Sequence, residues 1–167
     1  IEDMKILIIN FQYVEQQLRG VEMAIRQNWI PIKLKAVDDQ DLQIFSQFLY
    51  ESIVIPSEIK FEEKNQRFAM AIERFTWEHA KNESHLLMQV LSILVINYVE
   101  KANLKNISYN YKIKNILSIS NIDNNILIML NDNEVITLKV KKCFCLLEDI
   151  GKPIYPAIIP AHSKNDI

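Results

Sequence analysis

The stretch NILIMLNDNEVITLKV, residues 125–140, has a hydrophobic period that decides which fold the second half of the chain can adopt. Apolar residues alternate with other residues on both sides of a short Asn/Asp segment, as they do in half-buried strands. Asn and Asp are typical of tight turns between strands. The stretch therefore predicts a β-hairpin with one buried face, formed by Ile126, Ile128, Leu130, Ile136, Leu138 and Val140.

The segments around this hairpin extend the same pattern. Residues 108–120, SYNYKIKNILSIS, also alternate, and the polar segment NIDNN separates them from the hairpin. We therefore predict an antiparallel β-meander of about three strands over residues 107–150. Residues 151–167 contain three prolines, which lack a backbone N–H, so we expect an irregular tail there.

The first part of the chain, residues 1–106, has a helical period instead. Its N-terminal segment carries an apolar stripe with a spacing of three or four residues, which predicts a helix from about Asp3 to Gln27. A strand over residues 4–10, MKILIIN, is the competing prediction. The stripe consists of Met4, Leu7, Phe11, Val14, Leu18, Val21 and Ile25.

Three further helices are predicted before residue 107. The first is capped by Asp38 or Asp39, and the second extends from Ser57 or Phe61 to about Asn82. The third begins at Ser84 and is apolar on nearly every side, so we expect it at the centre of a bundle. The predicted buried side of the first helix comprises Leu42, Phe45, Phe48 and Leu49, and that of the second comprises Phe68, Ala71, Ile72, Phe75 and His79.

These patterns predict one domain of the α+β class over residues 1–167. A bundle of about four helices over residues 1–106 would pack against the β-meander of residues 107–150. The chain length of 167 residues and an apolar content of 49% suit a single domain with a sizeable core.

Composition argues against the common nucleotide-dependent and metal-dependent enzymes. The only glycines are Gly20 and Gly151, so the chain has no Gly-rich phosphate loop. The only cysteines, Cys143 and Cys145, form a C-x-C pair without the further Cys and His spacing of a structural zinc site. We therefore expect no cofactor and no metal, and two reduced thiols.

Hydropathy also bears on location. No stretch reaches the roughly 20 apolar residues needed to span a bilayer, and Gln89, Ser92 and Asn97 interrupt the longest candidate. We therefore expect a soluble cytoplasmic protein that does not bind membranes.

Arg74 and His79 lie five residues apart within ERFTWEHAKNESH, residues 73–85, on one of the predicted helices. The stretch RFTWEH resembles the Arg/His motif of HEPN domains, a family of all-helical dimeric RNases. The resemblance implies a metal-independent RNase in which Arg74 and His79 of two protomers supply acid/base catalysis and stabilise a charged phosphorane. The competing interpretation, which we favour, is structural: Arg74 would pair with Glu73 or Glu78.

A second alternative function rests on residues 101–114, where lysines and tyrosines are interleaved. Aromatic rings can stack on bases while lysines neutralise phosphates. The net charge of −2 for the whole chain disfavours nucleic-acid binding as the main function. The residues of this possible face are Tyr109, Tyr111, Lys112 and Lys114.

The function that we expect from the sequence is non-enzymatic protein binding, as in an inhibitor, immunity factor, adaptor or chaperone-like subunit. The partner would be another protein or a second copy of the chain. Residues 1–100 carry ten Lys/Arg against fifteen Asp/Glu, which suits a basic partner. The possible interface stripe comprises Phe11, Val14, Leu18 and Val21.

Overall fold

The protein is described here from a computed structural model. The structure describes residues 19–20, 29–80, 87–105, 107 and 113–155. Within them it has nine strands, two α-helices and two 3-10 turns. In chain order these are β1 (Lys33–Ala36), α2 (Asp39–Leu49), β2 (Ile53–Glu62), η1 (Glu63–Asn65), β3 (Arg67–Phe75), α3 (Trp77–Ala80), β4 (Gln89–Asn97), β5 (Val99–Asn103), β6 (Lys114–Ile122), β7 (Asn125–Leu130), η3 (Asn131–Asn133), β8 (Val135–Val140) and β9 (Cys145–Asp149).

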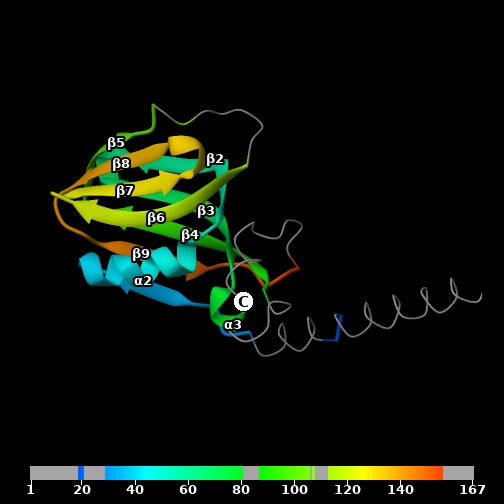
Figure 1. The fold of residues 1–167 in the computed structure, drawn as a ribbon. Coiled ribbons are helices and arrows are strands. Elements are labelled where there is room, and N and C mark those ends of the chain that lie inside the picture. The colour runs from blue at the N-terminus through cyan, green and yellow to red at the C-terminus, as the bar shows by residue number, and fades with distance from the viewer. Residues whose placement is uncertain (1–18, 21–28, 81–86, 106, 108–112, 156–167) are drawn as a thin grey trace, which may run out of the picture.

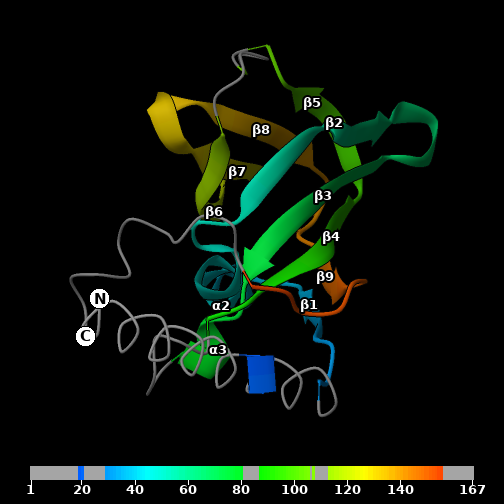
Figure 2. The ribbon, with the colours of Figure 1, turned by 90° about the vertical axis from the view of Figure 1, so that its right-hand side faces the viewer.

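The nine strands form one antiparallel sheet with the order β1-β9-β4-β3-β2-β6-β7-β8-β5. The sheet is strongly bent, so that β3, β4 and β9 lie on one side and β6, β7 and β8 on the other (Figures 1 and 2). We call β1, β9, β4, β3 and β2 leaf A, and β6, β7, β8 and β5 leaf B. Only two register pairs, Ile53 with Asn115 and Val54 with Lys114, join β2 to β6 where the leaves meet.

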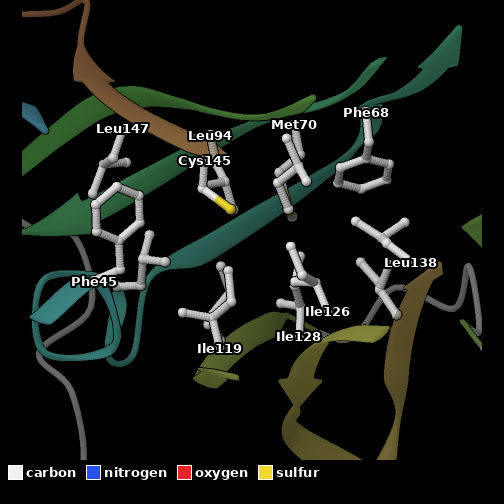
Figure 3. Packing of buried hydrophobic residues seen from close by; sticks show 14 of the residues in the cluster. Phe45, Phe68, Met70, Leu94, Ile119, Ile126, Ile128, Leu138, Cys145 and Leu147 are labelled. Atoms are coloured by element: carbon white, nitrogen blue, oxygen red, sulfur yellow. The ribbon is translucent and has the colours of Figure 1, made fainter. Parts of the chain in front are cut away.

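The core lies between the two leaves. Figure 3 shows Phe68, Met70 and Leu94 of leaf A facing Ile126, Ile128 and Leu138 of leaf B. Each of these six side chains is fully buried. Phe45 of α2 reaches into the same core, so the helix covers one open end of the bent sheet (Figures 2 and 3).

Helix α2 is the one predicted helix that the structure confirms. Asp38 caps it by accepting a 2.9 Å hydrogen bond from the backbone N–H of Asp41. Ser46 fixes the helix to β6, because its hydroxyl donates to the carbonyl oxygen of Ile119 at 2.8 Å and accepts from the N–H of Ile119 at 2.9 Å. The buried side chains of α2 are Leu42, Phe45 and Leu49.

The hairpin predicted over residues 125–140 is also confirmed. Strands β7 and β8 pair in antiparallel register, and all six residues of the predicted buried face are buried. The turn before β7 uses Asp123 and Asn124 with φ of 50° and 60°, a left-handed conformation that Asp and Asn tolerate. Strand β6 pairs with β7, so three strands form a meander, but residues 145–149 of the predicted range form β9, which pairs with β1 and β4 instead.

The predicted α+β fold, a four-helix bundle packed against the meander, is wrong, because the region between α2 and the meander is mainly β-structure and leaf A packs against leaf B. Residues 53–75 form the hairpin of β2 and β3, and residues 89–103 form β4 and β5. In β3, alternate residues from Phe68 to Arg74 are buried, which is a period of two. The helical prediction had combined residues from both faces of this strand.

Two further predictions lie wholly or partly outside the described residues. The N-terminal stripe, including Phe11, Val14, Leu18 and Val21, is one of them. The irregular tail is described only to residue 155, where Ile154 forms an isolated antiparallel bridge with Gln89. No helix in the described part of the chain combines the length and hydropathy that a membrane span requires.

Candidate functional site: the Arg74 cluster and the outer face of leaf A

Arg74 is the most unusual buried residue of the protein. It has no exposed surface, because the alternation of β3 directs it inward after Phe68, Met70 and Ile72. Its Nε donates to Oδ1 of Asp149 at 2.7 Å, and one terminal nitrogen donates to Oδ2 of the same carboxylate at 2.9 Å. This paired geometry is the one in which arginine binds a carboxylate most strongly.

Glu78 and a backbone carbonyl complete the coordination of Arg74. The two terminal nitrogens donate to the Glu78 carboxylate at 2.8 and 3.1 Å, and one of them donates to the carbonyl oxygen of Phe75 at 3.2 Å. A guanidinium has five N–H groups, and five hydrogen bonds are formed. All the donors of Arg74 are therefore engaged within the chain.

Asp149 is held as a carboxylate. Burial alone would raise the pKa of Asp149, but hydrogen bonding and charge attraction from Arg74 outweigh it and hold the pKa below its usual value. The N–H of Ile32 at 3.0 Å and the hydroxyl of Ser92 at 2.7 Å also donate to this carboxylate. Burial likewise tends to lower the pKa of Arg74, whereas the two carboxylates raise it, and the net shift is upward.

Aromatic rings enclose the cluster. The guanidinium carbon of Arg74 lies 5.9 Å from the ring centroid of Trp29 and 5.8 Å from that of Phe48, within cation–π range. Trp29 also packs against His79, with ring centroids 5.4 Å apart. The cluster therefore ties β3, β9, α2, α3 and the segment before β1 together, which is a structural role.

Arg74 and His79 lie on different secondary-structure elements. Arg74 lies on β3, whereas His79 is an exposed residue of the four-residue helix α3. The HEPN resemblance assumed that both residues lie on one helix of an all-helical protein, and this premise is wrong. Because its five donors bind groups of the same chain, Arg74 has no N–H free for a phosphate.

The predicted nucleic-acid face is described only in part. Tyr109, Tyr111 and Lys112 lie outside the described residues. Lys114 is 2% exposed, and its Nζ donates to Glu134 at 2.9 Å beside the joint between the two leaves. Its ammonium is thus directed into the protein instead of onto an exposed face.

The outer face of leaf A presents a different kind of surface, which the sequence analysis missed. Strand alternation places apolar residues of β3, β4 and β9 on the side away from the core. Their register forms rows across the sheet, with Val95 paired to both Leu146 and Ala69. We call this surface the leaf A face, and its apolar residues are Ala69, Ala71, Leu91, Ile93, Val95 and Leu146.

The chain after β9 extends this surface. Ile150 is 58% exposed and adjoins Leu91, because the N–H groups of Ile150 and Gly151 both donate to the carbonyl oxygen of Leu91, at 2.9 and 3.0 Å. A Cβ atom on Gly151 would lie 3.0 Å from the Cβ of Leu91, so glycine permits this close approach. Leu91 itself is 38% exposed.

Charged residues of both signs border the leaf A face, and two of its acids have partners within the chain. Glu148 pairs with Lys33 at 3.6 Å, and the carboxylate of Glu73 accepts a hydrogen bond from Gln89. The exposed cations Lys35, Lys60 and Arg67 form no ion pair with any residue that the structure describes. Within the described part of the chain, Lys35 and Lys60 are therefore free of ion pairs at two sides of the face, whereas Arg67 lies opposite Glu62 in the register of β2 and β3.

Leaf B has a less continuous apolar outer face. Its outward residues include Leu117 and Met129, which are 40% and 37% exposed. Hydroxyl side chains interrupt them, because Leu127 pairs with both Ser120 and Thr137, and Met129 pairs with Ser118 on one side and with Val135 on the other. Among the described residues, no group of three side chains is arranged to hold a metal ion.

Comparison with models of protein families shows which family the chain belongs to. Residues 32–162 match DUF2948, whose description is "Protein of unknown function". The match covers well over half of the chain and includes all nine strands, so the protein belongs to this family. Searches of curated proteins and of solved structures found no match.

Proposed function

We propose that the protein is a non-enzymatic protein-binding module and that the leaf A face is its binding surface. The observation that supports this proposal is the contiguous apolar centre of the leaf A face on the outside of the sheet, where Leu91 is exposed and its neighbours Ile93 and Val95 are half-buried. Contiguous apolar patches of this kind are typical of protein interaction sites, whereas isolated exposed apolar residues are common everywhere. Leu91, Ile93 and Val95 supply its central row on β4.

The shape of the leaf A face suits an elongated partner segment. Ala69 and Ala71 form a low strip on β3 beside the larger side chains of Ile93 and Val95 on β4. A segment lying over the alanines would contact the flanks of these larger side chains and remove them from water. Each large apolar side chain that becomes fully buried contributes about 1.5–3 kcal/mol, and partial burial contributes proportionately less.

The charges bordering the face indicate the chemistry of the partner. Lys35 lies on β1 at one side, and Lys60 lies on β2 at the other. A partner segment with apolar residues at its centre and Asp or Glu at its flanks would match both features. The sequence analysis had favoured a basic partner from overall charge, whereas Lys35 and Lys60, which form no ion pair with a described residue, favour acidic groups opposite them.

Other parts of the sequence prediction remain proposals. The stripe of Phe11, Val14, Leu18 and Val21 is a second candidate contact and would suit a helical partner or a second copy of the chain. An adaptor, inhibitor, immunity factor or chaperone-like subunit would each use such surfaces. A cytoplasmic location also belongs to the proposal, supported by the free cysteines Cys143 and Cys145.

A peptide selection tests the proposed surface without knowledge of the natural partner. A random peptide display library is selected on the immobilised full chain and counter-selected on the bare support. We expect enriched peptides with an apolar centre and acidic flanks. Their affinity should fall by about 30-fold or more in Ile93→Lys, because losing a central contact costs about 2 kcal/mol.

Matched variants distinguish binding at the leaf A face from the general effect of adding a charge to the protein. Leu127→Lys is a comparable change on the outer face of leaf B and should leave peptide binding intact. Lys60→Glu should weaken binding, and high salt should weaken it further. Peptides that bind native protein and Ile93→Lys equally well would refute the leaf A face as the binding surface.

A further inference from the structure

The two cysteines lie at a corner where the chain passes between the leaves. Strand β8 of leaf B ends at Val140, and strand β9 of leaf A begins at Cys145. The N–H of Lys141 donates to the carbonyl oxygen of Tyr98 at 3.0 Å, and the N–H of Asn97 donates to that of Phe144 at 3.0 Å. The backbone on both sides of Cys143 is therefore held in place by hydrogen bonds.

The opposite crossing lies at the same corner. Strand β4 of leaf A ends at Asn97 and strand β5 of leaf B begins at Val99, with Tyr98 between them. The Tyr98 and Phe144 rings pack edge to face with centroids 5.9 Å apart, and Lys142 Nζ lies 4.2 Å above the Tyr98 ring. Any covalent change at Cys143 and Cys145 thus acts where both chain crossings join the leaves.

The two thiols are adjacent and differ in environment. Cys145 is fully buried in the core, whereas Cys143 is only partly buried at its margin. A hydrogen bond from the Cys145 thiol lowers the pKa of Cys143, although burial and the carboxylates of Asp38, Asp39 and Asp41 oppose this shift. The same contact, together with burial, raises the pKa of Cys145.

We propose that Cys143 and Cys145 form a reactive thiol pair that closes to an intramolecular disulfide by exchange with a small disulfide of the glutathione type. Only Phe144 separates the two cysteines, so their Cα atoms lie no more than about 7 Å apart, and the chain can reach the Cα separation of roughly 4.4–6.8 Å that a disulfide accepts. Lys141 and Lys142 directly precede Cys143 and are exposed, so they offset the negative charge of Asp38, Asp39 and Asp41 when a disulfide that carries carboxylates approaches.

The reaction divides into two exchange steps. The Cys143 thiolate attacks one sulfur of the small disulfide, whose S–S bond breaks, and one small thiolate leaves with the electron pair. Cys145 then transfers its proton to solvent or to the departing thiolate and attacks the Cys143 sulfur, which releases the second small thiol. The protein loses two electrons and two protons, and the small disulfide is reduced to two thiols.

Intact-mass measurement of the full chain tests the proposal. The protein is equilibrated in glutathione buffers of increasing oxidised fraction, quenched in acid and alkylated. We expect native protein to lose both alkylation sites together and to carry no glutathione. In Cys145→Ala the mixed disulfide on Cys143 should accumulate, because the resolving thiol is gone.

The complementary variant assigns the attacking residue. In Cys143→Ser the buried Cys145 should remain free of glutathione while circular dichroism shows a native fold. Three results would overturn the proposal: native protein that keeps two free thiols in the most oxidising buffer, a mixed disulfide that persists in native protein, or a disulfide-linked dimer. Faster modification of Cys143→Ser than of Cys145→Ala would overturn the assignment of Cys143 as the attacking thiol.

Discussion

Replacing Arg74 with methionine tests the structural role of the Arg74 cluster. The change keeps most of the aliphatic volume and removes the five hydrogen bonds of the guanidinium. Asp149 then remains buried with the Ser92 hydroxyl and the Ile32 N–H as its donors. Breaking a buried ion pair by removing one partner typically costs about 3–5 kcal/mol.

The expected loss lies toward the lower end of this range, because two donors to Asp149 remain and the Glu78 side chain, 24% exposed, can turn toward water. We expect Arg74→Met to reduce the free energy of unfolding by about 3 kcal/mol. In a domain of this size, that loss corresponds to a fall of about 10 °C in melting temperature.

Urea unfolding followed by tryptophan fluorescence measures this loss, and Trp29 lies beside the cluster as a local probe. The matched control is Arg67→Met, because Arg67 is an exposed arginine on the same strand, and its replacement should change stability by less than about 0.5 kcal/mol. The double variant Arg74→Met/Asp149→Leu should recover part of the loss, since no buried charge is left uncompensated. A loss below about 1 kcal/mol in Arg74→Met would refute the reasoning.

Three further predictions concern stability. Leu138→Asp places an unpaired charge at a fully buried position of β8, so we expect circular dichroism to show loss of the folded state. A native spectrum and an unchanged melting temperature would contradict the placement of β8. Ser46→Ala removes both hydrogen bonds between α2 and Ile119 and should cost about 1–2 kcal/mol in urea unfolding, and no change would contradict their contribution. The pKa of Asp149 is lowered in the folded state, so its contribution to stability is present above its unfolded pKa of about 4 and is lost as pH falls through the folded pKa. Native protein should therefore lose more urea resistance between neutral pH and strong acid than Arg74→Met/Asp149→Leu does, and parallel profiles would contradict this linkage.

The elements that the sequence predicted correctly carry their buried apolar residues on one face only. Residues 125–140 alternate between apolar and other residues, and only one strand face is fully buried in the structure. Helix α2 combines the cap Asp38 with the spacing of Leu42, Phe45 and Leu49. In both cases the local period and the tertiary burial agree.

Strand β4 was mistaken for a helix because it is apolar on both faces. Val90, Leu94 and Ile96 enter the core, while Leu91 and its outward neighbours form the leaf A face. A continuous apolar run does not distinguish a strand from a buried helix by periodicity. The β-branched residues of LSILVI, residues 91–96, were the available signal, and a strand assignment would also have predicted the leaf A face.

The Arg74 cluster depends on contacts that no local pattern contains. Asp149 is 75 residues from Arg74 in sequence and reaches it because β9 returns beside β4. The sequence predicted a structural role for Arg74 and named Glu78 as a possible partner, and the structure confirms that pairing. Predicting the second partner, Asp149, would have required knowledge of the sheet order.

Site-specific photo-crosslinking in host cells tests the central claim most directly. A photoreactive amino acid replaces Ile93 on the leaf A face in one strain and Leu127 on the outer face of leaf B in another. The account predicts that position 93 crosslinks one defined protein, that position 127 does not, and that Lys60→Glu reduces the crosslink. Equal crosslinking from both positions, or a crosslink from position 93 only to a second copy of the chain, would contradict the leaf A face as the surface for a separate acidic protein partner.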